Sequence, residues 1–288
     1  MRDYVILTDS ACDISSEVLA EWGVRKKSLT YKFTGETKQY ENDEIPVLDF
    51  YQKMREGGVA KTAAVNVEGF TVLFEEVLKE GHDILYLGFS TGLSTTYNSA
   101  RFAAAQLSES YPEAKIITVD SLAASAGFGL LVYLVKEKKL SGATIEEAAK
   151  YAEDIKLKIC HWFTVDDLVY LKRGGRISSV AAFFGTVIGI KPVLHVDNAG
   201  KLINVSKVRG RKNSVIALAD QYGKLAEDPE GGTVFISHAD CQKDVDELTS
   251  ILKTRYGAKV ALVTYVGPVI GAHSGPGTLA LFFVGKER

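Results

Sequence analysis

Short apolar segments that alternate with helix-forming segments constrain the fold of this chain more than any other feature. The apolar segments of the first half are residues 4–7, 84–87 and 116–119, and the helix-forming segments are residues 69–80, 98–108 and 125–138. A strand that is apolar on both faces is typical of a parallel sheet covered by helices on both sides. The sequence therefore predicts an α/β domain over residues 1–155, with a parallel sheet flanked by helices.

The pattern changes in the second half of the 288-residue chain. The turn-forming residues Asp197-Asn198-Ala199-Gly200 separate two strand-like segments, which is typical of a β-hairpin. Further strands are expected at residues 233–237, 260–266 and 279–284, with helices at 215–224 and 244–256. We therefore expect a second, α+β domain over residues 156–288 with a mostly antiparallel sheet. Two domains also agree with the length, because one domain usually has roughly 100–200 residues.

Composition and charge argue against several classes of protein. The net charge is −2 and the pI is about 6.2, whereas nucleic-acid-binding proteins usually carry a basic excess. The three cysteines, Cys12, Cys160 and Cys241, are far apart, which indicates a reduced compartment and neither a disulfide framework nor a zinc site. The longest apolar stretch, residues 180–190, is shorter than the ~20 residues of a membrane helix, and the N-terminus shows no signal-peptide pattern. We expect a cytoplasmic protein without a transmembrane segment or a metal ion.

A loop rich in serine and threonine, residues 90–97, lies between an expected strand and an expected helix. Such a loop offers backbone N–H groups, hydroxyls and the positive end of a helix dipole to an anion. Ser94 is a good N-cap residue, so its hydroxyl has either a capping role alone or an anion-binding role as well. The loop predicts an anion site and leaves open whether a bond is made or broken there.

The same loop begins with Gly88-Phe89-Ser90-Thr91-Gly92, which matches the G-x-S-x-G pattern of the nucleophile elbow in α/β hydrolases. In a serine hydrolase or esterase, Ser90 would be the nucleophile, with His238 or His273 as its base. Asp240 would supply the acid. The simpler alternative is that the glycines only permit a tight turn after the strand. The residues alone leave both interpretations open.

Two further segments carry polar groups suited to anions. Arg173-Gly174-Gly175-Arg176 places two guanidinium groups beside flexible glycines, although a charged surface turn has the same composition. His273 lies in a Gly/Pro-rich loop, where a histidine near an anion is suited to donate or carry a proton. The basic residues between 207 and 212 leave a DNA-associated regulatory role as a third alternative, which the acidic pI disfavours. Thr62 has no distinctive local signal.

Taken in order, these and several other motifs resemble the bacterial DegV family, which includes the fatty acid-binding subunits of the fatty acid kinase system. The matching segments span nearly the full length and are Thr8-Asp9-Ser10 with Asp13, Lys61-Thr62, residues 90–97, Asp120-Ser121, Gly127-Phe128-Gly129, residues 171–178, Lys191-Pro192-Val193-Leu194, Lys207-Val208-Arg209-Gly210 and residues 267–273. The resemblance implies a DegV-like two-domain fold. It also implies one bound long-chain fatty acid, for example a palmitate-like chain, between or beneath the domains.

The resemblance further implies which residues lie at the head of this ligand. Thr62 and Ser94 would bind the carboxylate with their hydroxyls, helped by the backbone of Thr95. Arg173 and His273 would lie near the carboxylate and support phosphotransfer. The resemblance implies a lipid carrier rather than an enzyme, with no cofactor besides the fatty acid. A separate ATP-dependent fatty acid kinase would form the acyl phosphate, which an acyltransferase of phospholipid synthesis can use.

Two positions depart from the family pattern. Residues 62–66 read Thr-Ala-Ala-Val-Asn where the family commonly has Thr-Ser-x-Pro-Ser, and Thr95 stands where the family usually has glycine.

Burial of about 15 methylenes at ~0.8 kcal/mol each would contribute roughly 12 kcal/mol before association costs, so the tail would supply most of the affinity. Apolar segments suited to line this tail are residues 123–131, residues 181–190 and Val269-Ile270.

Overall fold

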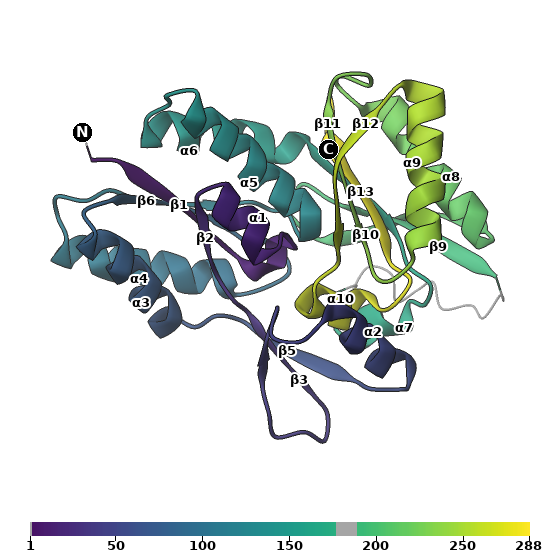
Figure 1. Cartoon of the computed structure of the whole chain (residues 1–288), viewed down its shortest axis with the longest axis horizontal. Coiled ribbons are helices and arrows are strands. Elements are labelled where there is room, and N and C mark those ends of the chain that lie inside the picture. The colour runs from purple at the N-terminus through teal and green to yellow at the C-terminus, as the bar shows by residue number, and fades with distance from the viewer. Residues whose placement is uncertain (1, 177–188) are drawn as a thin grey trace.

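A four-stranded parallel sheet forms the first half of the protein, which is described by a computed structural model for residues 2–176 and 189–288 (Figure 1). The strands are β1 (Tyr4–Asp9), β2 (Val24–Lys27), β6 (Asp83–Gly88) and β7 (Ile116–Asp120). Their order is β2-β1-β6-β7, and every neighbouring pair is parallel. All residues of β6 are buried, as expected for a central strand covered on both faces. The predicted parallel sheet is confirmed.

Helices cover both faces of this sheet. Figure 1 shows α3 (Val67–Lys79) with α4 (Thr96–Ser110) on one face and α5 (Ser125–Leu140) with α6 (Ile145–Ile155) on the other. The 3-10 helix η1 (Ser10–Cys12) and α1 (Ser16–Glu21) connect β1 to β2. Asn66 and Thr144 start α3 and α6 by accepting hydrogen bonds from backbone N–H groups of the first turn. The predicted helical flanks are therefore also confirmed.

The second half forms a six-stranded sheet of order β10-β9-β8-β13-β11-β12. The strands are β8 (Ile159–Thr164), β9 (Ile190–Val196), β10 (Leu202–Arg209), β11 (Thr233–His238), β12 (Lys259–Tyr265) and β13 (Leu279–Val284). All neighbouring pairs are antiparallel except β11 and β12, which confirms the mostly antiparallel sheet and the β9–β10 hairpin. α8 (Arg211–Leu225) and α9 (Gln242–Tyr256) cover one face above an apolar cluster.

α5 packs against the opposite face of the six-stranded sheet, so it is enclosed between that sheet, η1 and α6. Residues 125–132 of α5 are all buried, which is typical of a helix with neighbours on every side. Two glycines permit this close packing. A Cβ atom on Gly127 would lie 2.4 Å from His161 Nε2, and one on Gly129 would lie 2.6 Å from Ile14 Cδ1. A side chain at either position would push α5 away from β8 or from the segment after β1.

The sequence did not predict a third sheet, which has three antiparallel strands in the order β4-β3-β5. It contains β3 (Thr30–Phe33), β4 (Tyr40–Glu41) and β5 (Ala60–Ala63), and α2 (Val47–Arg55) lies between β4 and β5 in the chain. β5 has no apolar run, so its pairing with β3 rather than its local propensity makes it a strand. α10 (Pro268–Ser274) packs against α2, β3 and β5. The remaining elements are η2 (Lys156–Lys158) and α7 (Val169–Arg173).

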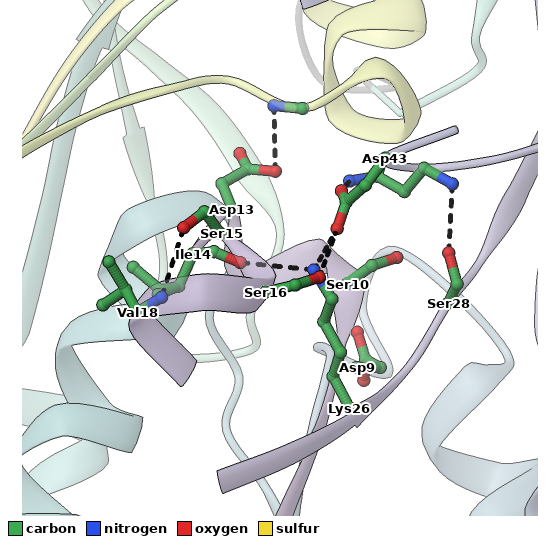
Figure 2. A network of polar contacts seen from close by, with 12 residues as sticks. Asp9, Ser10, Asp13, Ile14, Ser15, Ser16, Val18, Lys26, Ser28 and Asp43 are labelled. Carbon is green, nitrogen blue, oxygen red and sulfur yellow. Dashed lines mark hydrogen bonds and ion pairs between the residues drawn. The ribbon is translucent and has the colours of Figure 1, made fainter. Parts of the chain in front are cut away.

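Asp13 connects the segment after β1 to the second half of the chain. Its carboxyl group accepts hydrogen bonds from the Ser125 hydroxyl at 2.5 Å and from the Gly267 N–H at 3.0 Å. The Thr264 hydroxyl donates to the Asp13 carbonyl at 2.9 Å. Figure 2 shows the Asp13 side chain reaching the backbone N–H of the loop that precedes α10. Burial raises the pKa of this carboxyl group to about 7.

The two halves share a core. The strands of the parallel sheet come from residues before 121 and those of the six-stranded sheet from residues after 158, so we keep 1–155 and 156–288 as the proposed domains. One apolar cluster nevertheless includes Phe128 from the first part and Phe163 and Phe282 from the second. Among the helices of residues 2–176 and 189–288, none has both the length and the apolar character needed to cross a membrane.

Candidate functional site

Asp9, at the end of β1, fixes the loop that follows β6. Its Oδ2 atom accepts hydrogen bonds from the Tyr86 hydroxyl at 2.7 Å and from the Phe89 N–H at 2.9 Å. Its Oδ1 atom accepts a third from the Ala11 N–H at 3.1 Å. The side chain is buried, and burial raises the pKa of its carboxyl group to about 6. These bonds determine where the Ser/Thr-rich loop leaves the sheet.

Ser90 connects this loop to the turn between β9 and β10. Its buried hydroxyl donates to the Gly200 carbonyl at 2.8 Å and accepts from the Gly92 N–H at 3.1 Å. Within the described part of the chain, no histidine forms a hydrogen bond with this hydroxyl. His238 accepts a hydrogen bond from the Cys241 N–H at 3.2 Å instead. The geometry favours a structural role for Ser90 over that of a nucleophile.

Ser94 and Thr95 immediately precede α4. The Ser94 Oγ atom accepts a hydrogen bond from the Thr96 N–H at 3.2 Å and shares another with the Thr96 hydroxyl at 2.9 Å. Ser94 thus satisfies the N–H of the first helical residue, but the N-cap position is that of Thr95, one residue after the predicted one, and the Thr95 side chain forms no capping hydrogen bond. The positive end of the α4 dipole lies at the same point, because α4 begins at Thr96.

Thr62 and His273 come together from distant parts of the chain. Thr62 lies on β5 and His273 on α10, and 2.8 Å separate Thr62 Oγ1 from His273 Nε2. Burial, with a smaller effect from the charge of Arg176, lowers the pKa of His273 to about 4, so the imidazole is neutral near pH 7. Gly174 permits this arrangement, because a Cβ atom there would lie 2.2 Å from His273 Nδ1.

Arg173, the last residue of α7, and Arg176, which follows the helix, occupy different positions. The Arg176 guanidinium donates from Nε to the Leu93 carbonyl at 3.3 Å and from NH1 to the Gly174 carbonyl at 2.6 Å. Arg173, the arginine expected near the carboxylate, is exposed, and its guanidinium lies 5.8 Å from the centre of the Tyr170 ring. Arg176 therefore brings positive charge to the Ser/Thr-rich loop. The last two residues of the 171–178 motif lie outside the described residues.

A cavity of about 510 Å³ lies between the six-stranded sheet and the loops that follow β6 and β7. Its volume is in the usual range for a ligand pocket, and open α/β sheets bind ligands at the carboxyl ends of their strands. Large apolar side chains form much of its wall: Phe89, Phe163, Val196, Val269, Ile270 and Phe282. Ala124, Val269 and Ile270 belong to the segments predicted to line a tail, whereas residues 181–188 lie outside the described residues.

The cavity is polar at its opening and mostly apolar inside. Its polar lining residues include Thr62, Ser94, Thr95, Arg176, His273 and Ser274. The first five of these are partly or fully exposed, whereas Phe89, Phe163 and Phe282 are buried, so the opening is polar and the interior mostly apolar. The buried polar residues of the lining are Ser125, His161, Ser274 and Thr278. The structure thus brings Thr62, Ser94, Thr95 and His273 to one cavity. Arg176 rather than Arg173 is the arginine of its lining, and Ser274 is a lining residue that the sequence did not single out. The described residues contain no group of three His, Cys, Asp or Glu side chains placed to hold a metal ion.

Comparison with known sequences identifies relatives along the full length of the chain. A family model described as uncharacterised proteins of the DegV family matches residues 3–286. A DegV domain-containing protein of Clostridium perfringens is 43% identical over 290 residues, covering 100% of this chain and 99% of the relative. A fatty acid-binding protein of Thermotoga maritima is 33% identical over 292 residues, covering 98% of each chain.

Solved structures give the same result. A DegV family protein from Thermus thermophilus, described as binding fatty acid, superimposes with a TM-score of 0.89 at 30% identity, covering 99% of this chain and 100% of the other. A stearic acid-binding protein from Eubacterium ventriosum superimposes with a TM-score of 0.89 at 27% identity, covering 98% of each chain. The agreement extends over both large sheets, because nearly all of each chain is covered.

Proposed function

We propose, from the premise that this chain belongs to the DegV family, that it binds one long-chain fatty acid in the cavity between its sheets. The observation that carries the proposal is the polarity of this cavity, with hydroxyl and imidazole groups at the exposed end and a buried, mostly apolar interior. A fatty acid has the matching distribution, with a charged head and an apolar tail. The fatty acid-binding relatives from Thermus thermophilus and Eubacterium ventriosum support the proposal.

In this proposal Thr62 and Ser94 donate hydrogen bonds to the carboxylate, and the backbone N–H of Thr95 is a third donor. The contact between Thr62 Oγ1 and His273 Nε2 supports this assignment. A neutral imidazole that donates its Nε2 proton to Thr62 leaves the threonine proton free for the ligand. His273 is thus a positioning residue for Thr62. The N-terminus of α4 and the guanidinium of Arg176 make the opening favourable for an anion.

The tail supplies most of the affinity in this proposal, and the head fixes the register of the chain in the cavity. A hydrogen bond to a charged acceptor contributes about 1.5–3 kcal/mol, against roughly 12 kcal/mol of gross burial for the tail. Ala63 lines the cavity where the resemblance to the family leads one to expect a serine. We therefore expect an opening with fewer hydroxyl groups around the head.

We further propose that the protein is a carrier and that a separate ATP-dependent kinase phosphorylates the bound carboxylate. The partial exposure of Thr62, Ser94 and His273 supports this division of labour, because a head held at the opening is accessible to another protein. Arg173 is exposed at the end of α7, and in this proposal it supports phosphotransfer from outside the cavity. The acyl phosphate would then pass to an acyltransferase of phospholipid synthesis.

Extraction of the purified protein with organic solvent, followed by mass spectrometry, tests fatty acid binding directly. We expect to recover an acyl chain, and we expect delipidated protein to take up hexadecanoic acid. Protein that carries no acyl chain and takes none up would overturn the proposal.

Thr62→Val tests the head-group assignment, because it removes the hydroxyl and keeps the shape of the side chain. Loss of one hydrogen bond to a carboxylate should raise the Kd for hexadecanoic acid roughly 10- to 100-fold, measured by titration calorimetry. Thr71→Val is a matched control, because the Thr71 hydroxyl donates to the Val67 carbonyl within α3 and does not line the cavity. Equal affinities for wild type and Thr62→Val would show that Thr62 does not bind the head.

A serine hydrolase remains the alternative function and has less support. Ser90 donates its proton to the Gly200 carbonyl, and Asp240 forms an ion pair with Arg55 rather than with a histidine. Incubation with a fluorophosphonate probe separates the two functions, and we expect no labelling. Stoichiometric labelling that is lost in Ser90→Ala would favour the hydrolase.

A further inference from the structure

Ser274 is a buried polar residue of the cavity that neither the sequence motifs nor the head-group assignment explains. It follows His273 at the end of α10, and only 5% of its surface is exposed. Its Oγ atom is buried and has no hydrogen-bond partner among the described residues, although Ser274 itself belongs to the cavity lining. A buried hydroxyl without a partner is unfavourable, because it has lost its hydrogen bonds to water.

The orientation of α10 places Ser274 on the wall of the cavity, although its Oγ atom is covered in this side-chain conformation. Val269, Ile270, His273 and Ser274 all line the cavity, and their spacing of three or four residues places them on one face of the helix. Gly271 lies on the opposite face, where a Cβ atom would be 2.4 Å from the Tyr51 hydroxyl. Ser274 therefore lies on the ligand-facing side of α10 and further from solvent than His273.

We propose that the Ser274 hydroxyl, after rotation about its Cα–Cβ bond towards the cavity, donates a hydrogen bond to the ligand and binds the inner oxygen of the fatty acid carboxylate. This inference rests on the proposed function and adds a third side-chain hydroxyl to those of Thr62 and Ser94. The three hydroxyls come from α10, β5 and the loop before α4, so they approach the head from three directions. A carboxylate suits this arrangement, because its two oxygens accept about four hydrogen bonds.

The effect of Ser274→Ala on the free protein should be opposite to its effect on binding. In delipidated protein the substitution removes an unpaired buried hydroxyl, so the melting temperature should stay equal or rise. With hexadecanoic acid the substitution removes a charge-assisted hydrogen bond, so the Kd should rise roughly 10-fold or more. Ser274→Thr keeps the hydroxyl and should retain an affinity closer to wild type. Ser108→Ala is the matched control, because the Ser108 hydroxyl donates to the Ala104 carbonyl on α4, away from the cavity.

Calorimetry with hexadecanoic acid and with hexadecan-1-ol distinguishes the outcomes. A larger loss of affinity for the acid than for the alcohol in Ser274→Ala supports the inference. Equal affinities of wild type and Ser274→Ala for the acid would overturn it, and so would an equal loss for both ligands, which indicates a packing effect. If wild type itself binds neither ligand, the proposed function fails as well, so the two failures are distinguishable.

Discussion

The buried carboxyl group of Asp13 should make the stability of this protein depend on pH in a predictable direction. Asp13 links the segment after β1 to Ser125 of α5 and to Gly267 before α10. Asp13→Asn keeps the shape of the side chain and an acceptor for the Gly267 N–H, and asparagine tolerates the left-handed conformation at this position, where φ is 53°. The substitution therefore removes the titration while preserving most of the contacts.

The magnitude follows from the two pKa values of the group. Burial raises the pKa of Asp13 from 3.8 to about 7, so the folded protein holds this proton up to a higher pH than the unfolded chain. The stability that the protonated group provides is complete below pH 3.8 and is lost as the pH rises towards 7. At 1.36 kcal/mol per pKa unit, the full loss is about 4 kcal/mol, of which about 3 kcal/mol falls between pH 5 and pH 8.

Urea unfolding of wild type and Asp13→Asn at pH 5 and pH 8 measures this effect, because other titrating groups contribute equally to both proteins. We expect the free energy of unfolding of Asp13→Asn, relative to wild type, to increase by about 3 kcal/mol from pH 5 to pH 8. Asp49→Asn, at an exposed position on α2, should show no such change. The same difference between Asp13→Asn and wild type at both pH values would refute the reasoning.

Two further substitutions test contacts between segments. Ser90→Ala should lower the free energy of unfolding by about 1–3 kcal/mol in urea titrations, because the Gly200 carbonyl and the Gly92 N–H each lose a partner. An unchanged free energy of unfolding would show that Ser90 has no structural role. Arg288→Met should lower the free energy of unfolding by about 3 kcal/mol, because the guanidinium donates to the Leu122 carbonyl and to three other carbonyls. It should also increase amide hydrogen exchange around Leu122, and unaltered exchange there would contradict this reasoning.

The large sheets were predictable because their strands carry the signal within themselves. β6 is apolar over several consecutive residues and buried on both faces, so a short window of sequence suffices to identify it. β5 has the sequence Ala-Lys-Thr-Ala, which contains no such signal, and it becomes a strand through pairing with β3. The position of Thr62 next to His273 depends on this pairing, so the residues alone did not reveal it.

The parts of the candidate site differ in the same way. Ser94 was identifiable, because its hydroxyl acts on the helix that follows it directly. The choice between Arg173 and Arg176 depends on where α7 ends and on how the chain turns at Gly174, and neither is visible in the composition of the motif. Ser274 was overlooked because a serine beside a histidine has no distinctive pattern, and only the face of α10 on which it lies draws attention to it.

The walls of the cavity come from segments at opposite ends of the chain, from Thr62 on β5 to Phe282 on β13. No single segment can form the cavity, so a molecule inside it is bound only by the assembled protein. By mass action, such a molecule stabilises the entire folded state, by about 2.7 kcal/mol when its free concentration is 100 times its Kd. Resistance to proteolysis should then increase in both halves together as the cavity fills, and the lifetime of the protein would report the supply of its ligand.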